Sequence, residues 1–152
     1  MTTFELLVLL LARTCVAEIG FSASVDECVL MIEINDRNAQ SKKITLAKQT
    51  LNYNQYWMTR YQRKARPWIA YLEGKNKPRE WPKHLRWSNH VDKWIEYKES
   101  ISQYLRNVEA KEIKYICPSA IDYGAPYDKP PNGRKLIRCL NGRTEQKYYA
   151  RR

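Results

Sequence analysis

The stretch ARTCVAEIGFSASVDECVLMIEINDR, residues 12–37, decides the fold because it joins two helical patterns through a short turn. Apolar side chains recur at helical spacing in the residues before this stretch and in its first half. Gly20 is well suited to end that helix. Ser24 and Glu27 then match the capping box S-x-x-E, which opens a second helix over about 25–36. The sequence therefore predicts a helical hairpin.

The apolar start of the chain, ELLVLLLA at 5–12, could also be the core of a signal peptide. The preceding MTTFE contains no basic residue, and Arg13 interrupts the apolar run. We therefore interpret residues 4–19 as a structural helix. No apolar run in the sequence reaches the ~20 residues that a transmembrane helix needs.

Four cysteines allow three disulfide pairings. A tight turn between two helices would bring Cys15 close to Cys28, so a disulfide is feasible there. We expect a second disulfide, Cys117–Cys139, to close the C-terminal segment. Two disulfides imply an oxidising compartment, whereas four reduced cysteines would fit the cytosol. Because no CxxC pair occurs and the chain has two histidines, we expect no metal and no cofactor.

Three further helices are expected in the middle of the chain. They lie near 44–51, over PWIAYLEG at 67–74, and over about 90–108 with Asn89 as its N-cap. Trp68 and Trp94 are expected to be buried within this helical body.

The C-terminal segment, from residue 117 onward, is rich in Pro, Gly and Asn and has one short strand candidate, KLIRCL at 135–140. It has too little periodicity to fold alone, so it should pack over the helices. We therefore predict a mainly α fold with minor β structure, α+β at most, that forms a single domain over residues 1–152.

The formal net charge of +11 indicates an anionic partner, unless it serves solubility alone. Five Trp and eleven Tyr mean that some aromatic rings are exposed, which suits binding of sugars or bases. Basic and aromatic residues alternate in YWMTRYQRKARPW, residues 56–68, as nucleic-acid binding requires. The chain lacks a helix-turn-helix, finger or RNP motif, and we expect no nucleic-acid partner.

Glu18 is the candidate catalytic residue because it places a carboxylate on an apolar helix face, at the last turn. Partial burial and the negative end of the helix dipole both raise the pKa of such a group. A glutamic acid that stays protonated near neutral pH can donate a proton to a glycosidic oxygen. The alternative is a buried salt bridge to Arg13 or to Arg37.

Glycoside cleavage usually needs a second carboxylate. The candidates are Asp26, Asp36, Asp122 and Asp128. Asp26, like Glu27, is better explained as a favourable charge at a helix N-terminus.

Three blocks of the chain resemble the cell-wall hydrolases related to spore-cortex-lytic enzymes. LARTCVAEIGFSASVDECVLMIEINDRN (11–38) resembles the opening motif of that family, in which Glu18 matches the catalytic glutamate. CPSAIDYGAPYDKP (117–130) resembles the second block, and QKYYARR (146–152) resembles the closing one. Residues 40–110 do not align with the family.

This resemblance implies a lysozyme-like fold that cleaves the MurNAc–GlcNAc β-1,4 bond of peptidoglycan as a lytic transglycosylase. One glutamic acid then protonates the leaving oxygen and later accepts the proton of the MurNAc 6-hydroxyl. The expected partners are glycan strands and anionic cell-envelope polymers. The expected location is the cell envelope, the periplasm or the exterior, and a phage lysis or virion-entry enzyme would suit the compact chain. The expected substrate-binding aromatics are Tyr123, Tyr127, Tyr148, Tyr149, Trp57 and Trp81.

Two other functions fit the sequence. One is a basic nucleic-acid-binding protein without enzymatic activity, and the other is an inactive structural module that keeps a lysozyme-like fold. If the protein is an enzyme, the alternative to a lytic transglycosylase is a muramidase, which hydrolyses the same bond.

Overall fold

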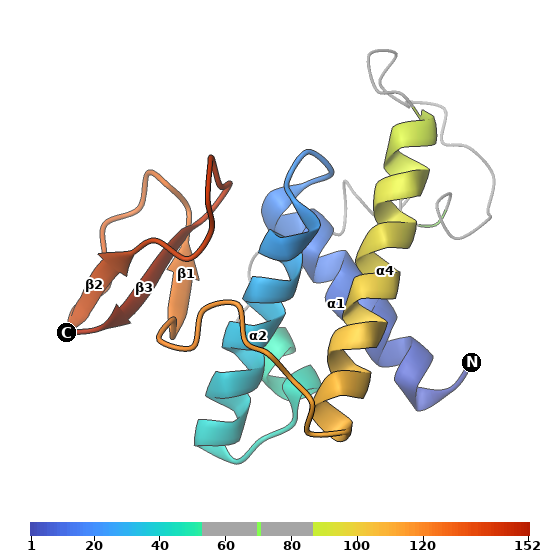
Figure 1. Cartoon of the computed structure of the whole chain (residues 1–152), viewed down its shortest axis with the longest axis horizontal. Coiled ribbons are helices and arrows are strands. Elements are labelled where there is room, and N and C mark those ends of the chain that lie inside the picture. The colour runs from blue at the N-terminus through green and yellow to red at the C-terminus, as the bar shows by residue number, and fades with distance from the viewer. Residues whose placement is uncertain (53–69, 71–86) are drawn as a thin grey trace.

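The computed structural model describes residues 1–52, 70 and 87–152, with the backbone alone for 87–89. Within these residues, three long helices form the body and a small sheet lies beside one of them (Figure 1). The elements are α1 (Thr3–Ile19), α2 (Val25–Lys42), α4 (Trp87–Glu109), β1 (Asp122–Gly124), β2 (Arg134–Ile137) and β3 (Lys147–Arg151). Residues 46–52 are also helical. The predicted class, mainly α with minor β, is confirmed.

The helical hairpin is confirmed, including its turn. The backbone N–H of Gly20 donates to the carbonyl oxygen of Val16 at 2.9 Å and closes α1. Gly20 has φ of +67°, a backbone conformation in which a side chain is strained. At the start of α2, the Ser24 hydroxyl accepts a hydrogen bond from the backbone N–H of Glu27 at 3.3 Å. The chain therefore turns where its sequence predicts.

Side chains of α4 hold the same turn from the other side. The Tyr97 hydroxyl donates to the carbonyl oxygen of Gly20, and the Lys93 ammonium donates to that of Ala23, both at 2.9 Å. These bonds satisfy carbonyl groups that the end of α1 and the turn leave without helical partners. They fix the end of α1 relative to α4.

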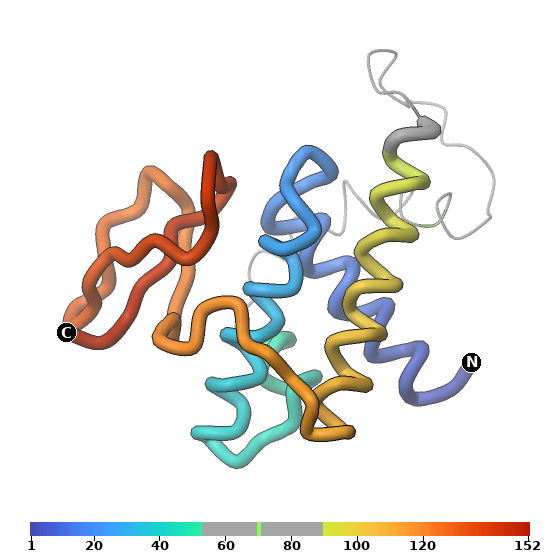
Figure 2. The backbone as a smooth tube through the Cα atoms, in the orientation of Figure 1, coloured from blue at the N-terminus to red at the C-terminus, as the bar shows by residue number. Residues whose placement is uncertain are grey.

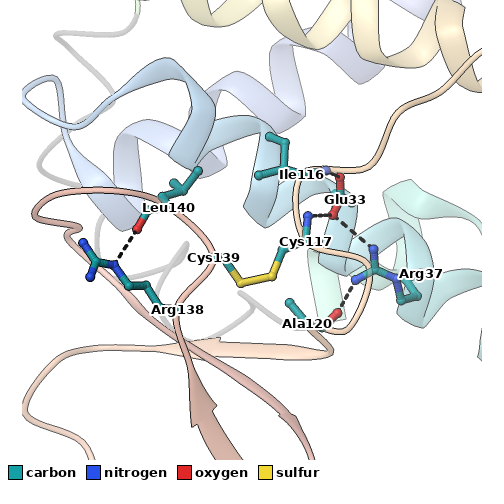
Figure 3. The surroundings of a disulfide bond; sticks show 8 residues. All are labelled: Glu33, Arg37, Ile116, Cys117, Ala120, Arg138, Cys139 and Leu140. Atoms are coloured by element: carbon teal, nitrogen blue, oxygen red, sulfur yellow. Dashed lines mark hydrogen bonds and ion pairs between the residues drawn. A yellow bond between two sulfur atoms is a disulfide. The ribbon is translucent and has the colours of Figure 1, made fainter.

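Both predicted disulfides are present. Cys15 and Cys28 join α1 to α2 with their Cα atoms 5.3 Å apart, and Cys117 and Cys139 join two parts of the C-terminal segment at 5.4 Å. Figure 3 shows the second disulfide beside the side chains of α2 that bind the same segment.

Helix α2 is the central element of the body and is buried on almost all sides. It packs against α1 and α4, and β1 of the sheet lies against it (Figures 1 and 2). Trp94 of α4 is 1 % exposed, as predicted. The apolar side chains that this packing excludes fully from solvent are Leu11, Ala12, Cys15, Cys28, Leu30, Met31, Ile34, Tyr97 and Ile101.

Two helix boundaries differ from those predicted. Helix α2 continues to Lys42, because Glu33 and Arg37 form an i,i+4 pair within it and Lys43 ends it in the left-handed conformation. Helix α4 begins at Trp87, so Asn89 lies inside its first turn and is not its N-cap. The helix predicted over 67–74 lies outside the described residues, apart from residue 70.

The sheet is antiparallel with strand order β1-β3-β2. Its register pairs Tyr123 with Tyr148 and Tyr148 with Ile137, so these three residues share one face. All three belong to the apolar core or pack against it. The sequence predicts β2 in part and misses β1 and β3, which are three and five residues long.

Candidate active site

Glu18 lines a pocket of about 500 Å³ at the C-terminal end of α1. One wall is the last turn of α1, the second is the loop after β1, and the third is the segment just before β3. The residues that line it are Ala17, Glu18, Tyr123, Gly124, Ala125, Pro126, Tyr127, Asp128, Glu145 and Gln146. The hairpin and the C-terminal segment therefore meet at Glu18.

The Glu18 carboxyl group is partly buried, and it accepts a hydrogen bond from the amide of Gln146. Within the described residues no basic side chain forms an ion pair with it, and Arg37 is bound to Glu33 instead at 3.1 Å. Burial raises the pKa of Glu18 from 4.5 to about 7. A group with this pKa is protonated in about half of the molecules at pH 7, as a general acid near neutrality requires.

Gln146 holds the Glu18 side chain in place. Its Nε2 donates to the backbone carbonyl of Glu18 at 2.9 Å and to the carboxyl Oε2 at 3.3 Å. A backbone carbonyl only accepts hydrogen bonds, so the Gln146 amide must present its nitrogen to Glu18. Oε2 accepts this bond, which leaves Oε1 available to carry the acidic proton of neutral Glu18. The sequence analysis missed Gln146, although it belongs to the closing block QKYYARR.

Glu27 fixes the segment that carries Gln146. Its carboxylate, 1 % exposed, accepts hydrogen bonds from the backbone N–H groups of Glu145 at 3.0 Å and Gln146 at 2.8 Å. It also accepts one from the Tyr148 hydroxyl at 2.8 Å. The sequence assigned Glu27 to the capping box and to a favourable charge at the helix N-terminus, whereas its carboxylate binds the C-terminal segment.

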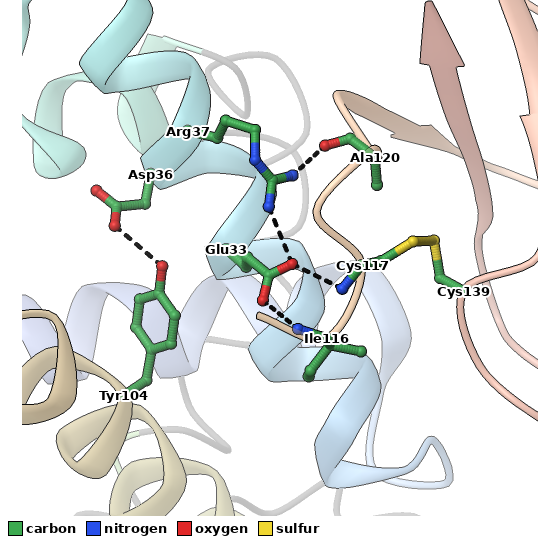
Figure 4. Close-up of polar contacts among 8 residues, drawn as sticks. All are labelled: Glu33, Asp36, Arg37, Tyr104, Ile116, Cys117, Ala120 and Cys139. Atoms are coloured by element: carbon green, nitrogen blue, oxygen red, sulfur yellow. Dashed lines mark hydrogen bonds and ion pairs between the residues drawn. A yellow bond between two sulfur atoms is a disulfide. The ribbon is translucent and has the colours of Figure 1, made fainter. Parts of the chain in front are cut away.

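A second buried glutamate of α2 binds the start of that segment. Glu33 accepts from the backbone N–H groups of Ile116 at 2.7 Å and Cys117 at 3.0 Å. Arg37 pairs with Glu33 and donates to the carbonyl oxygen of Ala120 (Figure 4). One face of α2 therefore supplies the polar partners of a segment that has little regular structure.

The predicted substrate-binding aromatic residues differ in whether they line the Glu18 pocket. Tyr127, 81 % exposed, and Tyr123, 3 % exposed, line the Glu18 pocket. Tyr148 and Tyr149 are buried at 2 % and 1 % exposure, and neither lines this pocket, so stacking on a sugar ring does not fit them. The Tyr148 hydroxyl instead donates a hydrogen bond to Glu27, and Tyr149 packs across the strand pair against Gly124. Trp57 and Trp81 lie outside the described residues.

Of the four predicted second carboxylates, Asp128 lines the pocket, and Glu145 joins it without having been predicted. The remaining three lie elsewhere: Asp26 in the first turn of α2, Asp36 bound to the Tyr104 hydroxyl at 2.9 Å, and Asp122 bound to the backbone N–H of Tyr123 at 2.9 Å. Three carboxyl groups of the described residues therefore line the pocket, and burial raises the pKa of Glu18.

Residues 1–52, 70 and 87–152 contain no group of His, Cys, Asp or Glu arranged to hold a metal ion. None of the helices in these ranges is both long and apolar enough to cross a membrane. Comparisons of the chain with protein-family models, with curated proteins and with solved structures find no match.

The raised pKa of Glu18 predicts that the protein loses stability as pH rises. The folded protein binds the Glu18 proton up to about pH 7, whereas the unfolded chain releases it near pH 4.5. The free energy of unfolding should therefore fall between pH 5 and 8, by on the order of 2 kcal/mol from this group. Urea denaturation of the wild type and of Glu18→Gln across this range measures the difference, in which other titrating groups cancel. Parallel curves for the two proteins would contradict the burial of Glu18.

Proposed function

We propose that the protein is a peptidoglycan-degrading glycosidase with a lysozyme-like fold, and that Glu18 is its catalytic acid. The observation that carries the proposal is a desolvated carboxyl group that lines a pocket, is held by a neutral amide and has no cationic partner among the described residues. A structural carboxylate would be expected to have partners such as those of Glu27 and Glu33, which accept backbone N–H groups. Glu18 accepts no backbone hydrogen bond in the described part of the chain.

The favoured mechanism is that of a lytic transglycosylase acting on the MurNAc–GlcNAc β-1,4 bond. Oε1 of Glu18 gives its proton to the glycosidic oxygen as the bond from that oxygen to C1 of MurNAc breaks. The Glu18 carboxylate then takes the proton of the MurNAc 6-hydroxyl while that oxygen bonds to C1, which closes an anhydro ring and restores the acid. The Gln146 amide stabilises the carboxylate between these steps by the hydrogen bond to Oε2.

Hydrolysis of the same bond is the second candidate, favoured because Asp128 and Glu145 line the pocket beside Glu18. Either carboxylate could activate a water molecule on the opposite side of the sugar from the acid. In that case the enzyme is a muramidase, and it needs two carboxyl groups rather than one.

Mass spectrometry of the products from purified peptidoglycan tests the proposal and separates its two forms. We expect muropeptides with 1,6-anhydro ends. Reducing ends would show that the enzyme is a muramidase. Intact glycan strands after prolonged digestion would contradict glycosidase activity and favour an inactive lysozyme-like module or a nucleic-acid-binding protein.

Within this proposal the protein acts in the cell envelope or outside the cell, on glycan strands and near anionic envelope polymers. The two disulfides are compatible with such an oxidising location. We infer that the protein is a phage lysis or virion-entry enzyme.

A further inference from the structure

The positive charge of the chain is concentrated in two segments rather than spread over it. Residues 129–152 contain eight Lys and Arg and one acidic residue, and residues 53–89 contain nine basic and two acidic residues. The remaining ranges, 1–52 and 90–128, each contain more acidic than basic residues. Solubility alone would not require this segregation, because a charge of +11 can be distributed over any surface.

The sheet gathers part of this charge on one face. Its register places Arg134 of β2 directly opposite Arg151 of β3. Since strand residues alternate between faces, Lys147 lies on the same face as Arg151, and so does Leu136, which is 58 % exposed. We call these three basic residues, Arg134, Lys147 and Arg151, the basic sheet face. Strands β2 and β3 lie farther from the helices than β1 (Figure 1).

The register also places one acidic residue, Asp122 of β1, on this face beside Tyr149, so the basic residues of the three strands outnumber the acid there. None of the three basic residues forms an ion pair within the described residues, and the Nε of Arg134 is buried there without a hydrogen-bond acceptor. The one acid of the segment, Glu145, lines the Glu18 pocket instead. Like charges that face each other across two strands destabilise a sheet. An anion bound between Arg134 and Arg151 would remove that repulsion.

We propose that the basic sheet face binds a phosphodiester polymer of the cell envelope that has no aromatic bases. Closely spaced phosphates match cations on adjacent strands, and arginine binds phosphate in a bidentate manner. A single-stranded nucleic acid would also need aromatic rings for stacking. The aromatic side chain that shares this face, Tyr149, is only 1 % exposed. The choice of an envelope polymer depends on the proposed function, whereas the anion-binding face does not.

The position of the face relative to the pocket fits a polymer that accompanies the substrate. Lys147 pairs with Gly124 in the register of β3 and β1, and Gly124 lines the Glu18 pocket. The basic sheet face therefore begins one strand away from the wall of the pocket. A polymer bound there would hold the enzyme on the wall while a glycan strand enters the pocket.

Fluorescence anisotropy with labelled poly(glycerol phosphate) tests the proposal. The triple variant Arg134→Gln, Lys147→Gln and Arg151→Gln should bind about tenfold more weakly at low salt, with a shallower dependence of affinity on salt, because fewer counterions are released. The matched control is Lys48→Gln, Lys111→Gln and Lys114→Gln, which removes the same charge from exposed positions outside the sheet. This control should bind within about twofold of the wild type.

The melting temperature and a second probe make the result decisive. Loss of like-charge repulsion should leave the triple variant melting at or above the wild-type temperature, so weaker binding cannot be attributed to unfolding. An equal loss in both triple variants would overturn the proposal, because binding would then follow net charge alone. Tighter binding of single-stranded DNA of equal charge would overturn it in favour of nucleic acid. Glu18→Gln should bind the polymer like the wild type, so a failed glycosidase proposal leaves this test intact.

Discussion

Replacing Glu18 by glutamine should reduce the release of muropeptides from purified peptidoglycan by about 10²-fold or more, because the variant has no proton to donate to the leaving oxygen. The substitution keeps the size of the side chain, and its amide oxygen can still accept the hydrogen bond from Gln146 Nε2. The melting temperature at pH 7 should therefore rise by several degrees, because glutamine stays neutral whereas the wild type loses stability as pH rises above 4.5. Product release is measured by chromatography of the soluble fragments at saturating enzyme.

Glu145→Gln is the matched control for this substitution, since it removes a carboxylate from the same pocket. A transglycosylase needs one acid, so this variant should keep most of its activity. Loss of activity in the Glu145 or Asp128 variant, together with reducing ends in the product, would assign a second carboxylate to the reaction. Undiminished activity of Glu18→Gln would exclude Glu18 as the acid. A strong loss of stability would instead identify Glu18 as a structural carboxylate.

The sequence predicts the parts of the fold that local signals determine. A glycine stop, a serine cap and the apolar spacing on both sides define the hairpin around Gly20 and Ser24, and the structure places both as predicted. Cys15 and Cys28 lie close together because the hairpin brings them there, so their disulfide follows from the same local pattern. Glu18 could be singled out as a candidate for the same reason, because it is a carboxylate at a predictable helix end.

The rest of the site depends on contacts between residues far apart in the chain, which periodicity does not show. Gln146 reaches Glu18 across 128 positions, and Ile116 reaches Glu33 across 83. The sequence did offer one signal for these contacts, namely carboxylates among the buried positions of α2. A buried carboxylate needs several hydrogen-bond donors, which distant segments must supply. The capping position of Glu27 was a sufficient explanation for a glutamate there, so its hydrogen bonds to the C-terminal segment were not predicted.

Removal of the Glu27 carboxylate should destabilise the protein more than any other single substitution considered above. Glu27→Leu leaves two backbone N–H groups and the Tyr148 hydroxyl buried without their acceptor. Breaking a buried charged interaction of this kind costs about 3–5 kcal/mol. For a chain of this size, the melting temperature should fall by roughly 10 °C or more. Thermal unfolding followed by circular dichroism measures the shift.

The size of the stability loss shows whether Glu27 only caps α2 or also anchors the C-terminal segment. If the side chain served the capping box alone, its loss would cost about 1 kcal/mol. Asp26→Asn, at the exposed neighbouring position in the first turn of α2, should cost less than about 1 kcal/mol. Tyr148→Phe removes one of the three donors and should cost about 1–1.5 kcal/mol, which keeps the test available if Glu27→Leu does not fold. A loss for Glu27→Leu no larger than that for Asp26→Asn would contradict the role of Glu27 as the anchor of the segment that positions Gln146 against Glu18.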